Sequence, residues 1–170
     1  NFKNNIKNSL SISSNSIHTI FEDHLGIIWI GTAGGGLNKL EKDGESFKRY
    51  FMKNGLPSNE IMAMLEDYKG HIWISTSKGL SNFDPINEKF VNFDVSDGLL
   101  SDGFNWGAAY QDNEGWLYFG TNSGLVYFQP NQIELNNYKP QIVITRFSFL
   151  KNKEWYSNSL FISEFNSSKN

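Results

Sequence analysis

The sequence of 170 residues has no cysteine, only four alanines, and no apolar run approaching the roughly 18 to 20 residues that cross a bilayer as a helix. The lack of cysteine excludes disulfides, thiolate metal sites and a cysteine nucleophile. The scarcity of alanine argues against a helical bundle, and no segment shows sustained 3.6-residue periodicity. The 15 basic and 18 acidic residues give a net charge of -3, so there is no broad electrostatic footprint for nucleic acid or an anionic membrane.

Aromatic residues are abundant instead, with 14 Phe, 7 Tyr and 5 Trp. Glycine, asparagine and serine separate them at short intervals, which is typical of many short strands joined by tight turns. The composition is too aromatic for a disordered chain. We therefore expect an all-β protein.

The strongest signal is an internal repeat. The segments IHTIFEDHLGIIWIGTAGGGL, IMAMLEDYKGHIWISTSKGL and GAAYQDNEGWLYFGTNSGL begin at Ile17, Ile61 and Gly107, and their aspartates are spaced by 44 and then 45 residues. A unit of this length built from four strands describes one blade of a β-propeller. The repeated positions are Asp23, Asp67 and Asp112, then Gly26, Gly70 and Gly115, then Trp29, Trp73 and Tyr118.

Each repeat divides into four short strands. In the first repeat we expect strands at residues 17–22, 27–32, 37–41 and 47–51, separated by glycine-containing turns. Both faces of the second strand are apolar, as they must be in a blade that lies between two neighbours. The sequence thus predicts a partial β-propeller of three four-stranded blades.

The repeats divide the chain into five parts. Three blades are too few to close a propeller, which normally has four to eight. The predicted parts are the end of a preceding blade or crossover at 1–14, a first blade at 15–58, a second at 59–101, a last blade at 102–136, and a different segment at 137–170.

The pattern N-x-I-x-x-I-x-E-D-x-x-G-x-I-W-I-G-T-x-x-G-L, followed by an aromatic outer strand and G-L-P-S-N, resembles the two-component regulator propeller repeat over about residues 8 to 133. The segment from Pro140 is similar to the first strands of the three-tyrosine β-sandwich that follows these propellers, which would be truncated here. The resemblance implies the periplasmic sensor region of a hybrid two-component histidine kinase. Such a parent spans the inner membrane, works as a homodimer, senses oligosaccharides and controls polysaccharide-utilisation genes.

The repeated residues have a structural and a functional interpretation. An aspartate at the same turn of every blade is typical of a residue that accepts backbone hydrogen bonds, with the following glycine left-handed. Paired carboxylates of a glycosidase, and repeated rings that stack on a carbohydrate, are the functional alternatives. His18, His24 and His71 have no metal-ligand spacing, so we expect no metal site.

Ligand contacts are expected where the loops differ between blades. In an up-and-down blade, the turn between the second and third strands emerges on the same face as the crossover to the next blade. The third repeat also has two extra residues near Asn105 and Trp106, which form a plausible sugar-stacking pair or fill the entry to the strand. The candidate ligand-binding residues are Asn15, Asn59, Ser77, Lys78, Asn105, Trp106, Asn122 and Ser123.

The leading hypothesis is a ligand-sensing module with no catalytic residue, no cofactor, no bound nucleic acid and an oligosaccharide partner. The first alternative is a propeller glycosidase or lyase, for which the loop face offers the carboxylates of Glu60, Asp97 and Asp102. The second alternative is a protein-interaction scaffold without a small ligand.

Overall fold

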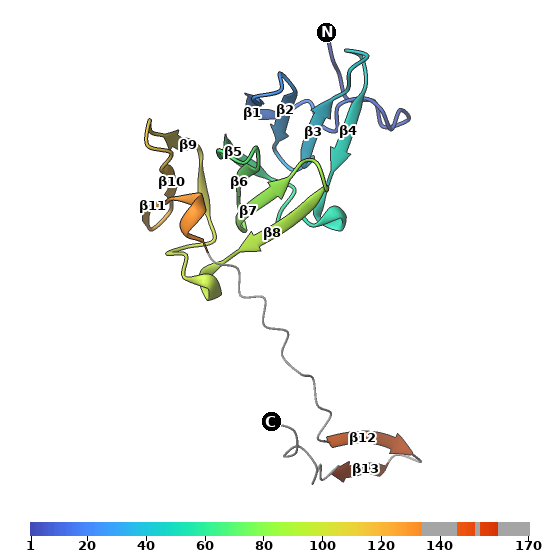
Figure 1. Ribbon diagram of the computed structural model, residues 1–170. Coiled ribbons are helices and arrows are strands. Elements are labelled where there is room, and N and C mark those ends of the chain that lie inside the picture. The colour runs from blue at the N-terminus through green and yellow to red at the C-terminus, as the bar shows by residue number, and fades with distance from the viewer. Residues whose placement is uncertain (134–145, 152–153, 160–170) are drawn as a thin grey trace, which may run out of the picture. The chain divides into compact units, whose positions relative to one another are not determined.

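The structure, a computed structural model, describes residues 1–133, 146–151 and 154–159. It has two compact units, Asn1–Ile133 and Glu134–Asn170 (Figure 1). In the first unit, consecutive antiparallel strands form three separate sheets, one for each sequence repeat. The predicted all-β, partial-propeller architecture is therefore confirmed.

The first two sheets have four strands each, in sequence order. The first contains β1 (Ile17–Glu22), β2 (Ile28–Thr32), β3 (Leu37–Leu40) and β4 (Phe47–Tyr50). The second contains β5 (Ile61–Glu66), β6 (Ile72–Thr76), β7 (Gly79–Asp84) and β8 (Lys89–Phe93).

The third sheet has three strands within the described residues. They are β9 (Phe104–Gln111), β10 (Leu117–Thr121) and β11 (Gly124–Phe128). Short 3-10 helices follow the last strand of each sheet, at η1 (Met52–Asn54), η2 (Val95–Asp97) and η3 (Pro130–Gln132).

The second unit contains one antiparallel hairpin, β12 (Arg146–Lys151) with β13 (Glu154–Ser159). The remainder of the segment predicted to begin a β-sandwich, within 137–170, lies outside the described residues. The β-sandwich therefore stays a prediction.

The first strands of the three blades lie next to one another, β1 beside β5 and β5 beside β9, at the inner side of the fan seen in Figure 1. Glycine allows this close approach at Gly31, because a Cβ there would lie 2.5 Å from Cγ2 of Ile61 on the neighbouring blade. These strands are the ones that would line the axis of a complete propeller.

An aspartate organises the turn between the first two strands of every blade. Oδ1 of Asp23 accepts hydrogen bonds from the backbone N–H groups of Leu25 and Ile27, both at 2.9 Å, and Oδ2 accepts one from Nε1 of Trp29 at 2.8 Å. Asp67 makes the same three contacts, with Nε1 of Trp73 at 2.9 Å. Both oxygens accept hydrogen bonds, so the buried carboxylate is satisfied and the indole is held in one orientation.

The third blade keeps this arrangement with a tyrosine. Asp112 accepts two backbone N–H groups at 2.9 Å and the hydroxyl of Tyr118 at 2.9 Å. The glycine three residues after each aspartate is left-handed, with φ of 77° at Gly26, 78° at Gly70 and 81° at Gly115. A side chain with a Cβ would be strained at these turns.

The ring fixed by each aspartate packs against the following blade. Trp29 is fully buried and meets Phe83 of the second blade edge to face at 5.6 Å between ring centroids. Trp73 meets Phe128 of the third blade at 4.7 Å. Residues from both blades surround each ring, so the hydrophobic cores lie between sheets.

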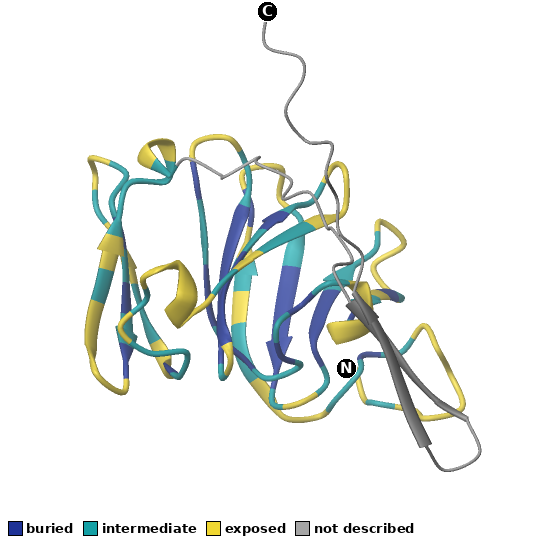
Figure 2. Cartoon of the chain, turned by 90° about the horizontal axis from the view of Figure 1, so that it is seen from below, coloured by how far each residue is buried: buried dark blue, intermediate teal, exposed yellow. Residues whose placement is uncertain are grey.

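The corresponding face of the third blade has no further described blade against it. There Tyr118 stacks on Tyr127 at 5.9 Å and lies 6.1 Å from Tyr110. Tyr110 and Tyr127 are each about 60% exposed. Figure 2 shows buried residues concentrated along the central strands, whereas the sheet at the left, that of the third blade, carries long exposed stretches.

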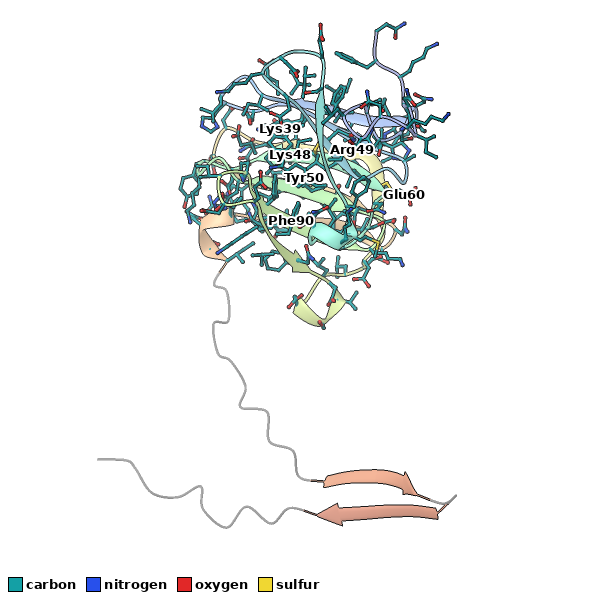
Figure 3. The ribbon with its side chains drawn as sticks, turned by 90° about the vertical axis from the view of Figure 1, so that its right-hand side faces the viewer. Lys39, Lys48, Arg49, Tyr50, Glu60 and Phe90 are labelled. Carbon is teal, nitrogen blue, oxygen red and sulfur yellow. The ribbon has the colours of Figure 1, made fainter. Side chains whose placement is uncertain are left out.

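Polar contacts reinforce the junction of the first two blades. Nδ1 of His24, in the first turn, lies 2.5 Å from Oε1 of Glu66 on β5. At the outer strands, Glu88 accepts a hydrogen bond from Nζ of Lys48 and another from the hydroxyl of Tyr50 at 3.0 Å. Burial and the bond to Glu88 raise the pKa of Tyr50. Figure 3 shows Lys48 and Tyr50 beside Phe90 of the second blade, whose ring centroid is 6.0 Å from that of Tyr50.

The hydrogen bonds of the turn aspartates predict that the same substitution, aspartate to asparagine, lowers the free energy of unfolding by different amounts in the second and third blades. In Asp67→Asn, the new amide N–H₂ would face the Nε1–H of Trp73, which can only donate, so we expect a loss of about 1–3 kcal/mol in unfolding free energy. In Asp112→Asn, the hydroxyl of Tyr118 can rotate and accept, so the loss should be smaller. Urea unfolding at constant m-value measures both, and equal losses would contradict the explanation.

The His24–Glu66 contact predicts a pH-dependent stability. The hydrogen bond to Glu66, with the negative charges of Glu66 and Asp23, raises the pKa of His24. The resulting stabilisation is fully present below the pKa of unfolded histidine, about 6.5, and is lost as pH rises through the higher folded pKa. Wild type should therefore exceed His24→Gln in melting temperature at about pH 5.5, with the difference shrinking by about pH 8.5. A difference independent of pH would contradict this.

Candidate functional site at the inner ends of the blades

The loops predicted to share a face are hydrogen-bonded to one another. The backbone N–H of Gly36, in the turn after β2, donates to the carbonyl of Asn59 at 2.7 Å. In the next blade, Gly79 donates to the carbonyl of Asp102 at the same distance. The turn between second and third strands is thus attached to the crossover that leads into the next blade.

The three crossovers carry one amide or carboxylate at an equivalent position. Oδ1 of Asn15 accepts the backbone N–H of Asn4 at 2.7 Å, and Oδ1 of Asn59 accepts that of Met52 at 2.8 Å. Oδ1 of Asp102 accepts the N–H of Val95 at 2.8 Å. These side chains close the crossover loops, so an acceptor oxygen of each is already occupied by the fold.

The predicted residues of the turns are placed differently from one another. Oγ of Ser77 lies 2.9 Å from Oγ of Ser58. Lys78 and Ser123 follow equivalent threonines and donate their backbone N–H to the hydroxyls of Thr76 and Thr121. Lys78 is exposed on a loop of the second blade, and Asn122 and Ser123 are exposed on a loop of the third. Whether any of the eight candidate residues binds a ligand stays a prediction.

The irregularity in the third blade is a bulge of its inner strand. Phe104 pairs with Thr121 and Ala109 with Phe119, so four residues of β9, Asn105 to Ala108, stand opposite the single Gly120. In the first two blades the inner strand has only one extra residue at this place, between Ile17 and Thr19 in β1 and between Ile61 and Ala63 in β5. The bulge therefore contains the two additional residues of the third repeat, and it includes Gly107 with φ of 67°.

The bulge projects Trp106 toward the first blade. Its indole Nε1 donates to the backbone carbonyl of His18 on β1 at 2.6 Å. The two rings lie 5.5 Å apart between centroids, tilted by 39°. Trp106 nevertheless remains 66% exposed, in contrast to the buried Trp29 and Trp73.

The neighbours of Trp106 are themselves held in place. Nδ1 of His18 lies 3.0 Å from the carbonyl of Ile61, which can only accept, so Nδ1 carries a proton. Nδ2 of Asn105 donates to the carbonyl of Thr121 at 3.0 Å. These contacts leave Nε2 of His18 and Oδ1 of Asn105 without a recorded partner in residues 1–133.

The sequence did not single out His18 as a partner of Trp106. The two residues are 88 positions apart, and only the curvature of three successive blades brings them together. The extra residues of the third repeat were the available signal, but they identify Trp106 alone.

Two of the three carboxylates considered for catalysis accept hydrogen bonds within the loops. Asp97 accepts the backbone N–H of Asp94 at 3.0 Å, and Asp102 accepts that of Val95. The backbone of Glu60, not its carboxylate, forms the β-bridge with Ala33 that joins the first two blades. Among the described residues, no group of three or more His, Cys, Asp or Glu could hold a metal ion.

Comparison with known proteins agrees with the repeat. The family model for the two component regulator propeller matches residues 11–34 and 55–78. These are two-component regulator propeller repeats. Each matched segment contains a crossover, the first and second strands of a blade and the aspartate turn between them.

Longer similarities extend over most of the chain. It is 36% identical over 137 residues to histidine kinase P4 of Formosa agariphila, covering 80% of this chain and 10% of that protein. It is similar to the extracellular domain of a hybrid two-component system from B. thetaiotaomicron, with 30% identity, a TM-score of 0.72, and coverage of 89% of this chain and 21% of that domain. A second extracellular domain from B. thetaiotaomicron, with 19% identity and a TM-score of 0.63, shares the fold.

The chain thus spans about a tenth of the curated relative and about a fifth of the solved extracellular domain it matches. Within the described residues, no helix has the length and apolar character needed to cross a membrane.

The crossover contacts predict that Asn59 contributes to stability. Asn59→Ala removes the acceptor of the Met52 N–H and should lower the unfolding free energy by about 1 kcal/mol. Asn59→Asp keeps an acceptor, as Asp102 does in the next blade, and should be close to wild type. Urea unfolding of the two variants tests this, and equal destabilisation would show that the hydrogen bond is unimportant.

Proposed function

We propose that this chain is part of the extracytoplasmic sensor of a two-component histidine kinase and that it binds oligosaccharides released from polysaccharides. The parent protein would be a homodimer in the inner membrane, with this part of it in the periplasm. It would carry the signal across the membrane to genes for polysaccharide use. The observation that carries the proposal is the combined match in repeat, fold and sequence to a histidine kinase and to the extracellular domain of a hybrid two-component system.

The loop face supports binding of a hydroxyl-rich ligand. Its exposed side chains are mainly amides and hydroxyls, and they vary between blades whose framework residues are repeated. Variable loops on a rigid scaffold are where binding sites generally occur. A ligand can act on a kinase through such a site only if it binds two states of the sensor with different affinity.

A binding role fits the contacts better than a catalytic one. The repeated aspartates each accept three hydrogen bonds in a blade turn, and Asp97 and Asp102 are engaged in loop closure. A glycosidase needs two carboxylates free to face a scissile bond across a defined gap.

Calorimetry of the chain with a panel of neutral and acidic oligosaccharides, followed by product analysis, tests the proposal. We expect heat of binding with at least one glycan and no change in that glycan after prolonged incubation. Turnover that is lost in Glu60→Gln or Asp102→Asn would contradict the proposal in favour of an enzyme. No heat with any glycan, together with binding to a protein partner, would favour a scaffold.

A further inference from the structure

We propose that Trp106, with His18 and Asn105, forms a stacking subsite for one neutral pyranose ring at the inner end of the blades. The inference rests on the proposed function, because it assigns a place and a chemistry to the ligand of that sensor. It names His18, a residue on another blade, as part of the same site.

Trp106 is not one of the buried rings that form the cores between the blades. The ring positions that hold the blades together are occupied by Trp29 and Trp73, which are at most 3% exposed, whereas Trp106 is 66% exposed. Trp106 exists because of an insertion that the other two blades lack. An exposed tryptophan produced by a local bulge, on the inner strand, is more consistent with ligand contact than with framework.

The indole ring of Trp106 is held in place before any ligand binds. Its Nε1–H donates to the carbonyl of His18 at 2.6 Å, so rotation of the side chain would break a hydrogen bond. An aromatic surface that is already fixed loses little conformational entropy when a ligand stacks on it. This hydrogen bond joins the third blade to the first, so the position of the indole ring also depends on how the three blades are arranged.

His18, whose ring lies 5.5 Å from that of Trp106, and Asn105, which precedes Trp106 in the bulge, each keep an acceptor group. With Nδ1 of His18 donating to Ile61, neutral His18 presents Nε2 as an acceptor. Asn105 donates through Nδ2 to Thr121 and keeps Oδ1 as an acceptor. A pyranose offers an apolar C–H face to the indole and donating hydroxyls at its edge, which complements this arrangement.

The ligand is assigned as neutral because, among the described residues, the contacts of the Trp106 indole are with His18 and include no lysine or arginine. A nucleotide or an acidic sugar would need such a cation near the platform. The net charge of -3 also disfavours anions over the molecule as a whole.

The test compares variants of the full chain by calorimetry with methyl glycosides of glucose, galactose, mannose and xylose, the corresponding β-linked disaccharides, and glucuronic acid. Trp106→Ala should weaken binding of the preferred neutral sugar by about 10-fold or more. Trp106→Phe keeps an aromatic ring but removes the hydrogen bond to the carbonyl of His18, and should weaken binding by about 3-fold. His18→Ala keeps the carbonyl that accepts from Trp106 but removes the imidazole, and should also weaken binding.

Tyr110→Ala is the matched control, because Tyr110 lies on the same strand and is 64% exposed. It should change affinity by less than about 2-fold. Unfolding curves for each variant separate loss of binding from loss of fold.

Wild type that binds a neutral sugar, with Trp106→Ala weakened and the control unchanged, supports the subsite. Wild type that binds while Trp106→Ala binds equally well overturns the subsite and leaves the proposed function standing. Preference for glucuronic acid overturns the assignment of a neutral ligand. Wild type that binds none of these probes overturns the subsite and counts against oligosaccharide binding by this chain.

Discussion

The packing of one aromatic ring per blade against the next blade is the interaction on which the rest of the structure depends. Trp29 and Trp73 each extend from a second strand into a core shared by two sheets. Their orientation is set by an aspartate that also closes the preceding turn. One side chain thus connects local turn geometry with the arrangement of whole blades, which explains why aspartate, glycine and the ring recur together at 44- to 45-residue spacing.

This repeated framework allows the crossovers, and the turns that are attached to them, to differ in sequence between blades. The crossovers are closed by Asn15, Asn59 and Asp102, and the turns after the second strands are attached to them by backbone hydrogen bonds. An insertion can therefore be accommodated in one inner strand without disturbing the cores. The bulge at Asn105–Ala108 is such an insertion, and its tryptophan reaches the first blade. Under the proposed function, a ligand bound there would act on the contact between the third and first blades.

The fold could be predicted from the sequence because its signals are local and repeated. Turn glycines, strand alternation and the spacing of the aspartates are all visible in one blade and supported by the next two. The sequence predicts that apolar faces pack between neighbouring blades, but it does not predict which polar residues pair across these contacts. The pairings His24–Glu66 and Tyr50–Glu88 occur once each and depend on how neighbouring sheets are rotated.

The candidate site was predictable only in part for the same reason. Trp106 and Asn105 are revealed by a change in repeat length, which is a sequence property. His18 looks like an ordinary strand residue, and its relation to Trp106 arises from the path of the chain through the intervening sheet of the second blade. Asn15 and Asn59 look like free polar loop residues, although their side chains hold the crossovers.

The most direct measurement is the indole N–H region of a ¹⁵N-correlated NMR spectrum of the full chain during titration with a neutral oligosaccharide. Trp106→Phe assigns the resonance of Trp106, and the buried Trp29 and Trp73 provide internal references. We predict that the Trp106 indole signal moves with saturating dose dependence while those of Trp29 and Trp73 remain in place. A glycan that binds and shifts other indoles but not that of Trp106 would contradict the assignment of the site.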